Sequence, residues 1–237
     1  MSKKGLSEII KALKTAFPLT LPVLAGFFIL GTAYGVLMSS VGLGVGWTFL
    51  NSFLVFAGSI QYAAIPLFLA PFNPIYAFFL TIMVNARHIF YGLSMLDKVN
   101  ETGGFKPYII FGLCDESFSI HSVHEPPGDV DRGLFMFFIT FLNRWYWILS
   151  CIFGAVLGKM IPFAVQGLEF SLTALFVVIF LNQWEVKEAR MSSILGIGCS
   201  LLSLLVFGAS NFLIPAMILI LAVFAFTPNP ARKGVQP

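Results

Sequence analysis

The sequence predicts an all-α membrane protein, a polytopic bundle of about seven or eight transmembrane helices in a chain of 237 residues. Hydrophobic residues make up 58% of the chain and charged residues only 11%, whereas soluble domains average roughly 45–50% and about 25%. The mean hydropathy is +0.89. A soluble fold cannot bury this much apolar surface, so lipid must be the main solvent. The length allows seven or eight spans of ~20 residues and leaves no room for a separate soluble domain.

Three segments are expected along the chain. Residues 1–16 are predicted to be an amphipathic cytoplasmic lead-in that lies at the membrane surface. Residues 17–227 form a single transmembrane transport domain, and residues 228–237 form a short polar tail. The apolar stretch that begins at Phe17 is too long for the core of a cleavable signal peptide, so we expect a membrane span there.

The apolar runs define the expected spans. They cover residues 17–40, 47–70, 74–96, 108–123, 133–157, 163–183, 192–207 and 211–227. The last two runs are short, and a single crossing there would lower the count from eight to seven. With eight spans and a cytoplasmic N-terminus, nine Lys and Arg residues fall on the cytoplasmic side and three outside. The positive-inside rule favours that orientation.

Glycine and proline residues predict that some of these helices are broken. The candidate positions are Gly31, Gly35, Gly58, Ser59 and Pro66. Proline removes a backbone donor and glycine weakens a helix, so we expect an interruption near residues 58–61. For Gly31 and Gly35 a second interpretation stays open, because small residues four apart let two membrane helices approach closely.

A short internal echo suggests an inverted repeat. Residues 139–145 (Ile-Thr-Phe-Leu-Asn-Arg-Trp) resemble residues 178–184 (Val-Ile-Phe-Leu-Asn-Gln-Trp), and the two spans are expected to run in opposite directions. Inverted repeats are common in secondary transporters. Seven residues make this a hint only.

Polar side chains inside the apolar runs are the candidate substrate-binding or coupling residues. They are Gln61, Asn85, Arg87, His88, Asp115, Glu116, Asn143 and Arg144. An ionisable group within a span costs at least ~2.5 kcal/mol on insertion scales and usually faces a bundle interior or a water cavity. Such a set of cations, acids and amides can bind a zwitterion or carry protons. The alternatives are a structural ion pair for the acids and, for Arg87, a snorkelling position at the membrane interface.

These polar groups are expected to serve transport rather than catalysis. Neither the zinc-protease spacing nor the Gly-x-Ser-x-Gly nucleophile pattern occurs, and the three cysteines have no paired spacing. We therefore expect no enzymatic activity, cofactor or bound metal, and the terminal basic residues do not predict a nucleic-acid partner. A passive channel or an intramembrane enzyme remains the alternative, although scattered charged groups favour a coupled carrier.

Four motifs together resemble the AzlC family, the large subunit of branched-chain amino-acid exporters. They run from Phe17-Pro-Leu to Gly31-Thr-Ala-Tyr-Gly, then Phe56-Ala-Gly-Ser-Ile-Gln-Tyr, then Asn85-Ala-Arg-His with Tyr91-Gly, and Asp115-Glu-Ser-Phe. The resemblance covers about residues 14–210. It implies export of Leu, Ile, Val or similar hydrophobic amino acids such as Met across a bacterial cytoplasmic membrane. It also implies a small second membrane subunit of the AzlD type. Coupling to an ion gradient is a separate hypothesis, which Asp115 and Glu116 suggest.

Overall fold

The computed structural model describes residues 5–71, 73–160, 177, 180–181, 184, 187–208 and 212–226. All regular secondary structure in these residues is helical, which confirms the all-α prediction. Most of the predicted span 163–183, most of the echo at 178–184 and the tail 228–237 lie outside the described residues. The contacts divide the chain into residues 1–169 and residues 170–237, and each unit is described by itself.

Helix α1 is one continuous helix over Leu6–Ser40 and is about 52 Å long at 1.5 Å per residue. Because the hydrocarbon core is about 30 Å thick, α1 extends well beyond it. Pro18 and Pro22 lie inside α1, and no helix boundary occurs near residue 16. Ala12 and Ala16, at the end of the predicted lead-in, are fully buried. Placement of the lead-in at the membrane surface stays a prediction.

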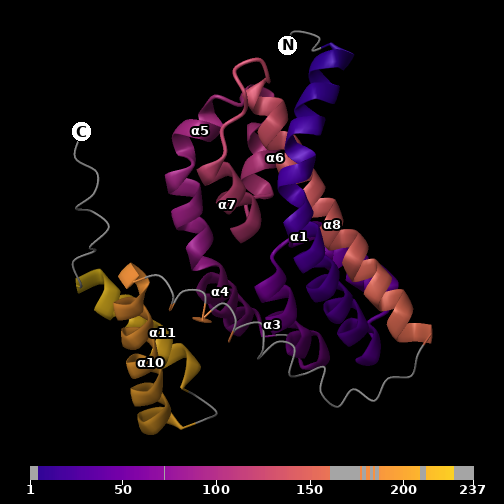
Figure 1. Cartoon of the computed structure of the whole chain (residues 1–237). Coiled ribbons are helices and arrows are strands. Elements are labelled where there is room, and N and C mark those ends of the chain that lie inside the picture. The colour runs from indigo at the N-terminus through magenta and orange to yellow at the C-terminus, as the bar shows by residue number, and fades with distance from the viewer. Residues whose placement is uncertain are drawn as a thin grey trace. The chain divides into compact units, whose positions relative to one another are not determined.

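Helix α8, Arg132–Met160, runs beside α1 (Figure 1). By length and composition, these two of the described helices are long and apolar enough to cross a membrane. The two helices are parallel, because Gly31 lies against Ser150 and Gly158 lies against Ser39. The parallel direction is the one expected when the first and fifth predicted spans cross in the same sense, whereas the orientation of the chain stays a prediction.

Glycines let the backbones of α1 and α8 touch. A Cβ atom added at Gly35 would lie 2.0 Å from the Cys151 carbonyl oxygen, and one at Gly154 would lie 2.0 Å from the Thr32 carbonyl oxygen. The packing interpretation of Gly31 and Gly35 is therefore confirmed. The expected helix break at these two positions is wrong, since α1 continues through both.

The second apolar run is broken, as expected, but slightly earlier in the chain. Helix α2, Val45–Leu54, ends before Phe56, whose φ of 40° lies in the left-handed region. Helix α3, Gly58–Leu69, begins immediately afterwards. The break thus covers residues 55–57 rather than 58–61, and Gly58 and Ser59 start the next helix. Pro66 lies inside α3 and does not interrupt it, so this break candidate is wrong.

The fourth apolar run is also broken, which the sequence reasoning missed. Unbroken helix α4, Pro74–Ser94, is followed by short helices α5, Leu96–Asn100, and η1, Gly103–Phe105. The chain then forms α6, Lys106–Phe111, and α7, Asp115–Val123, instead of one helix over 108–123. The Ser117 hydroxyl fixes the break, because it donates to the Gly112 carbonyl at 2.8 Å and accepts from the Cys114 N–H at 2.9 Å.

The second unit contains two described helices. Helix α10 covers Lys187–Phe207 and helix α11 covers Leu213–Phe226, and the two helices contact each other. They correspond to the predicted runs 192–207 and 211–227. The number of spans stays a prediction.

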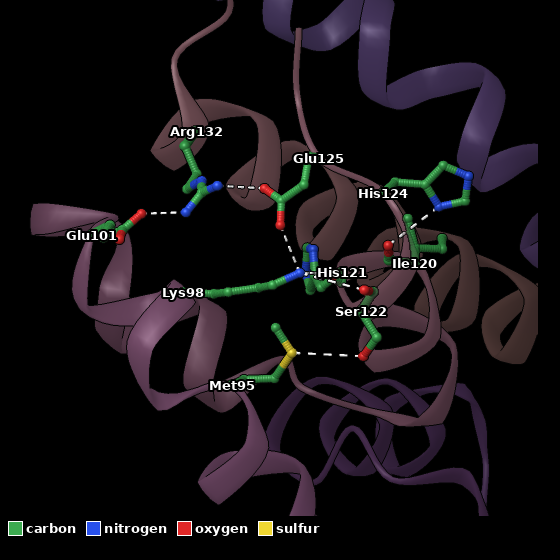
Figure 2. Close-up of polar contacts among 9 residues, drawn as sticks. All are labelled: Met95, Lys98, Glu101, Ile120, His121, Ser122, His124, Glu125 and Arg132. Carbon is green, nitrogen blue, oxygen red and sulfur yellow. Dashed lines mark hydrogen bonds and ion pairs between the residues drawn. The ribbon is translucent and has the colours of Figure 1, made fainter. Parts of the chain in front are cut away.

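An ion-pair cluster holds the C-terminal end of α7 (Figure 2). The Lys98 ammonium donates to the His121 carbonyl at 3.0 Å and pairs with Glu125 at 2.7 Å. Glu125 also pairs with Arg132 at the start of α8, and Arg132 pairs with Glu101. The cluster thereby connects α5, α7 and α8. It positions α7, whose opposite end carries Asp115 and Glu116.

The pKa of Glu125 lies below the ordinary value of a glutamate, chiefly because the Lys98 ammonium hydrogen-bonds to its carboxylate. Its stabilising effect is therefore complete above the ordinary pKa and is lost as the pH falls through the lowered value. We expect Glu125→Gln to lower the thermal stability slightly at neutral pH, by less than about 1 kcal/mol for exposed pairs. The deficit should disappear in acid. Melting curves of the detergent-solubilised protein across pH measure this, with Asp97→Asn, outside the cluster, as the control. A deficit that is independent of pH would contradict the assignment.

Candidate functional site

Arg87 connects the N-terminal ends of α3 and α7, the two helices that begin after the helix breaks. From α4, one terminal nitrogen of its guanidinium pairs with Asp115 Oδ2 at 2.8 Å, and the other donates to Ser59 Oγ at 2.8 Å. Ser59 lies in the first turn of α3 and Asp115 in the first turn of α7. The positive charge of Arg87 is thus matched by an acid from within an apolar run. One guanidinium therefore connects both helix breaks.

The Arg87–Asp115 pair leaves hydrogen-bonding capacity on both partners. The Nε–H of Arg87 and Oδ1 of Asp115 are buried, and neither has a partner among the described residues. Oδ1 of Asn85, two positions before Arg87 on α4, is also buried and has no partner among the described residues. Buried polar atoms nearly always have a partner in native proteins. The Arg87–Asp115 pair therefore offers one charged donor and one acceptor to a polar ligand, whereas Asn85 lies on a different face of α4 from Arg87.

His88 and Glu116 are placed differently from these residues. His88 turns back toward its own helix, with Nδ1 3.2 Å from the Asn85 carbonyl oxygen. Its ring meets Tyr91 edge-on, and Tyr91 stacks on Phe118 of α7 at 4.4 Å between centroids. Glu116 is partly buried and forms no ion pair with any residue that the structure describes. The two acids thus have different surroundings, as their adjacent positions predict.

Gln61 lies one turn into α3 and contacts α8. Trp147 Nε1 donates to Gln61 Oε1 at 2.8 Å, whereas Gln61 Nε2 has no partner in the described part of the chain. The Trp147 ring also covers Gly58, where an added Cβ would be 3.0 Å from the ring. Trp147 is not among the residues that the sequence predicted for the site, but it is only 3% exposed. Trp147 lies four residues after Asn143, and this helical spacing could have predicted that both side chains share one face of α8.

Asn143 and Arg144 form a second polar group beside the break between α2 and α3. Asn143 is fully buried, and neither side-chain amide atom has a partner among the described residues. Arg144 is 8% exposed and donates to the Phe53 carbonyl at 2.7 Å. Its guanidinium lies over the rings of Phe53 and Phe111, at 4.6 and 4.7 Å.

The predicted polar residues therefore form two groups that meet at the first turn of α3. Arg87 and Asp115 are connected to that turn through Ser59. Gln61, Trp147 and Arg144 lie on the side of α8. Within the described residues, no cluster of three His, Cys, Asp or Glu side chains is arranged to hold a metal ion.

These features define a helical membrane protein whose charged residues are held at interrupted helices. The family model described as "AzlC protein" matches residues 22–161, and the chain belongs to the AzlC family. It is 48% identical over 228 residues to "Branched-chain amino acid transport protein AzlC" of Bacillus subtilis, covering 96% of this chain and 90% of the relative.

Two further relatives carry only a general description. An uncharacterized membrane protein of Haemophilus influenzae is 42% identical over 90% of this chain and 87% of its own length. One of Helicobacter pylori strain J99 is 34% identical over 92% of this chain and 96% of its own length. No solved structure matches the chain.

Proposed function

We propose that this protein exports branched-chain or similar hydrophobic amino acids from the cytoplasm through seven or eight spans of the bacterial cytoplasmic membrane. Its N-terminus lies in the cytoplasm, and it acts with a small AzlD-type membrane subunit as a secondary transporter driven by an ion gradient. The printed name of the Bacillus subtilis relative supports the substrate class. The continuous match over most of both chains supports the transfer of that class to this protein.

The single observation that carries the proposal is the Arg87–Asp115 pair, in which one donor and one acceptor have no partner among the described residues. An amino acid is a zwitterion, so a site for it needs a donor for the carboxylate and an acceptor for the ammonium. Arg87 Nε–H supplies the first, and Oδ1 of Asp115 supplies the second. Charge-assisted hydrogen bonds of this kind are stronger than hydrogen bonds between neutral groups.

The helix break adds to the attraction for the carboxylate. The first N–H groups of a helix have no intrahelical partner, and that end carries a partial positive charge. The first turn of α3, at Gly58 and Ser59, lies beside Arg87. Discontinuous helices whose N-termini face anionic substrate groups are a recurring device of secondary transporters. A carboxylate at this point therefore meets both the guanidinium and the end of α3.

Efflux of labelled amino acids tests the function. Cells that express this chain are loaded with labelled Val, Leu, Ile or Met, with and without its small partner subunit. We expect faster efflux of these substrates than in cells with an empty vector, and no such effect for labelled Lys or Glu. A carrier should also respond to an imposed proton gradient and saturate with internal substrate, whereas a passive channel should not. Equal efflux with and without the chain would refute the proposal.

Coupling is expected to depend on the acids at the start of α7. Asp115 is paired with Arg87, whereas Glu116 forms no ion pair with a described residue, so we expect Glu116 to be the acid that exchanges the proton. Glu116→Gln should therefore make efflux insensitive to an imposed pH gradient, while Asp115→Asn should weaken substrate binding as well. Asp97→Asn is the control, because Asp97 is exposed and lies outside the ion-pair cluster that positions α7. An unchanged pH dependence in both acid variants would remove this assignment.

A further inference from the structure

Arg144 carries a full positive charge into the protein interior without an acid to balance it. Arg144 is 8% exposed, and no carboxylate among the described residues lies within ion-pair distance of its guanidinium. An uncompensated buried charge costs several kcal/mol or more. Other groups must therefore stabilise this guanidinium.

The end of α2 supplies this stabilisation. The last carbonyls of a helix have no intrahelical partner and together carry roughly half a negative charge. α2 ends at Leu54, and the Phe53 carbonyl accepts from the guanidinium at 2.7 Å. The break that follows at Phe56 prevents α2 from continuing into α3. Arg144 thus satisfies a carbonyl that the helix break leaves free.

Aromatic faces complete the cation site. The guanidinium carbon lies 4.6 Å from the Phe53 ring centroid, 4.7 Å from that of Phe111 and 5.5 Å from that of Tyr108. Each face attracts a cation by about 0.5–2 kcal/mol. Phe111 is the last residue of α6. The guanidinium therefore lies between the C-terminal ends of α2 and α6, the two helices that precede the breaks. The Phe53 carbonyl and three aromatic faces together form a site for one cation, which the protein fills with its own side chain.

In secondary transporters, unwound carbonyls and the C-terminal ends of half-helices are where coupling ions such as sodium bind. We propose that Arg144 is a tethered cation that occupies this position at the end of α2, so transport needs no bound sodium ion there. This inference rests on the proposed transport function for its consequence, but not for the cation site itself. Arg144 is then a positioning residue that holds the break, and Arg87 is the arginine that faces substrate.

The cation site is tested by chemical rescue in the full chain. Arg144→Ala removes the guanidinium, and melting of the detergent-solubilised protein is followed in low millimolar methylguanidinium, sodium or choline chloride. We expect a lowered melting temperature, of which methylguanidinium restores about half or more by binding the folded state. The wild type and Arg132→Ala, at an exposed ion pair, should show no such gain. Absence of rescue by any of these cations, or an unchanged melting temperature, would overturn the proposal.

Wild-type efflux tests the consequence and requires no variant. Labelled leucine efflux from proteoliposomes, with the small subunit included, should have the same rate in sodium, potassium and choline salts. A strict requirement for sodium would overturn the inference while leaving amino-acid export intact. Absence of efflux in every salt, together with methylguanidinium rescue of Arg144→Ala, would instead refute the proposed function and leave the tethered cation established.

Discussion

Arg87→Gln is expected to reduce amino-acid efflux by about 30-fold or more while the protein still reaches the membrane. Removing one partner of a buried hydrogen-bonded charge pair costs about 2–5 kcal/mol, and Arg87 is only partly shielded, which favours the lower end. The variant loses the contacts to Asp115 and Ser59 together with the free Nε donor. Initial rates of labelled leucine efflux, normalised to the amount of protein in the membrane, measure the effect.

A second variant at this position separates charge from geometry, and a variant elsewhere is the control. Arg87→Lys keeps the charge but cannot reach both half-helices with a planar fork, so an intermediate rate is expected. Arg132→Gln is the matched control, since Arg132 also bridges acids but lies in the exposed cluster near the end of α7. Normal efflux by Arg87→Gln would show that the guanidinium has no part in transport.

Gly35→Ala is expected to lower the melting temperature by about 5–10 °C, because overpacking a close contact costs typically 1–3 kcal/mol. The added Cβ would lie 2.0 Å from the Cys151 carbonyl oxygen and 2.5 Å from the Ala155 nitrogen. Both are backbone atoms of α8 and cannot rotate away, so α1 and α8 must separate. The melting curve of the solubilised protein, with size-exclusion profiles to check dispersity, measures this.

Gly26→Ala on the same helix is the matched control. No atom lies within 4 Å of a Cβ built at Gly26, so this substitution should leave stability unchanged or raise it slightly. Equal melting temperatures for Gly35→Ala and the wild type would mean that α1 and α8 do not pack in the way described.

The two helix breaks show where sequence reasoning succeeds and where it fails. Gly58 and Ser59 pointed to the break in the second run, because glycine in an apolar run weakens the helix. The break before Asp115 was missed, although the chain carries the usual signals of a helix start there. Asp115 and Glu116 place negative charge in the first turn of α7, where the helix dipole favours it. Reading them only as buried charges hid this second role.

The candidate residues were identifiable one by one, but their partners were not. A charged or amide side chain in an apolar run is conspicuous in any sequence, as Arg87 and Asn143 are. Which acid Arg87 meets depends on how α4 packs against α7, and the answer is Asp115 rather than Glu116. Trp147 escaped notice because an aromatic residue in such a run has many ordinary roles.

The sequence by itself determined that the solvent is lipid, that the chain is helical, and which residues are costly to place in the membrane. These properties are sums over composition and short spacings, so they do not depend on the arrangement of the helices. Only the tertiary structure decided that Arg87 ties the starts of α3 and α7 together, and that Arg144 binds the end of α2 without an acid. Those pairings join segments 28 and 91 residues apart, and packing rather than local sequence brings such segments into contact.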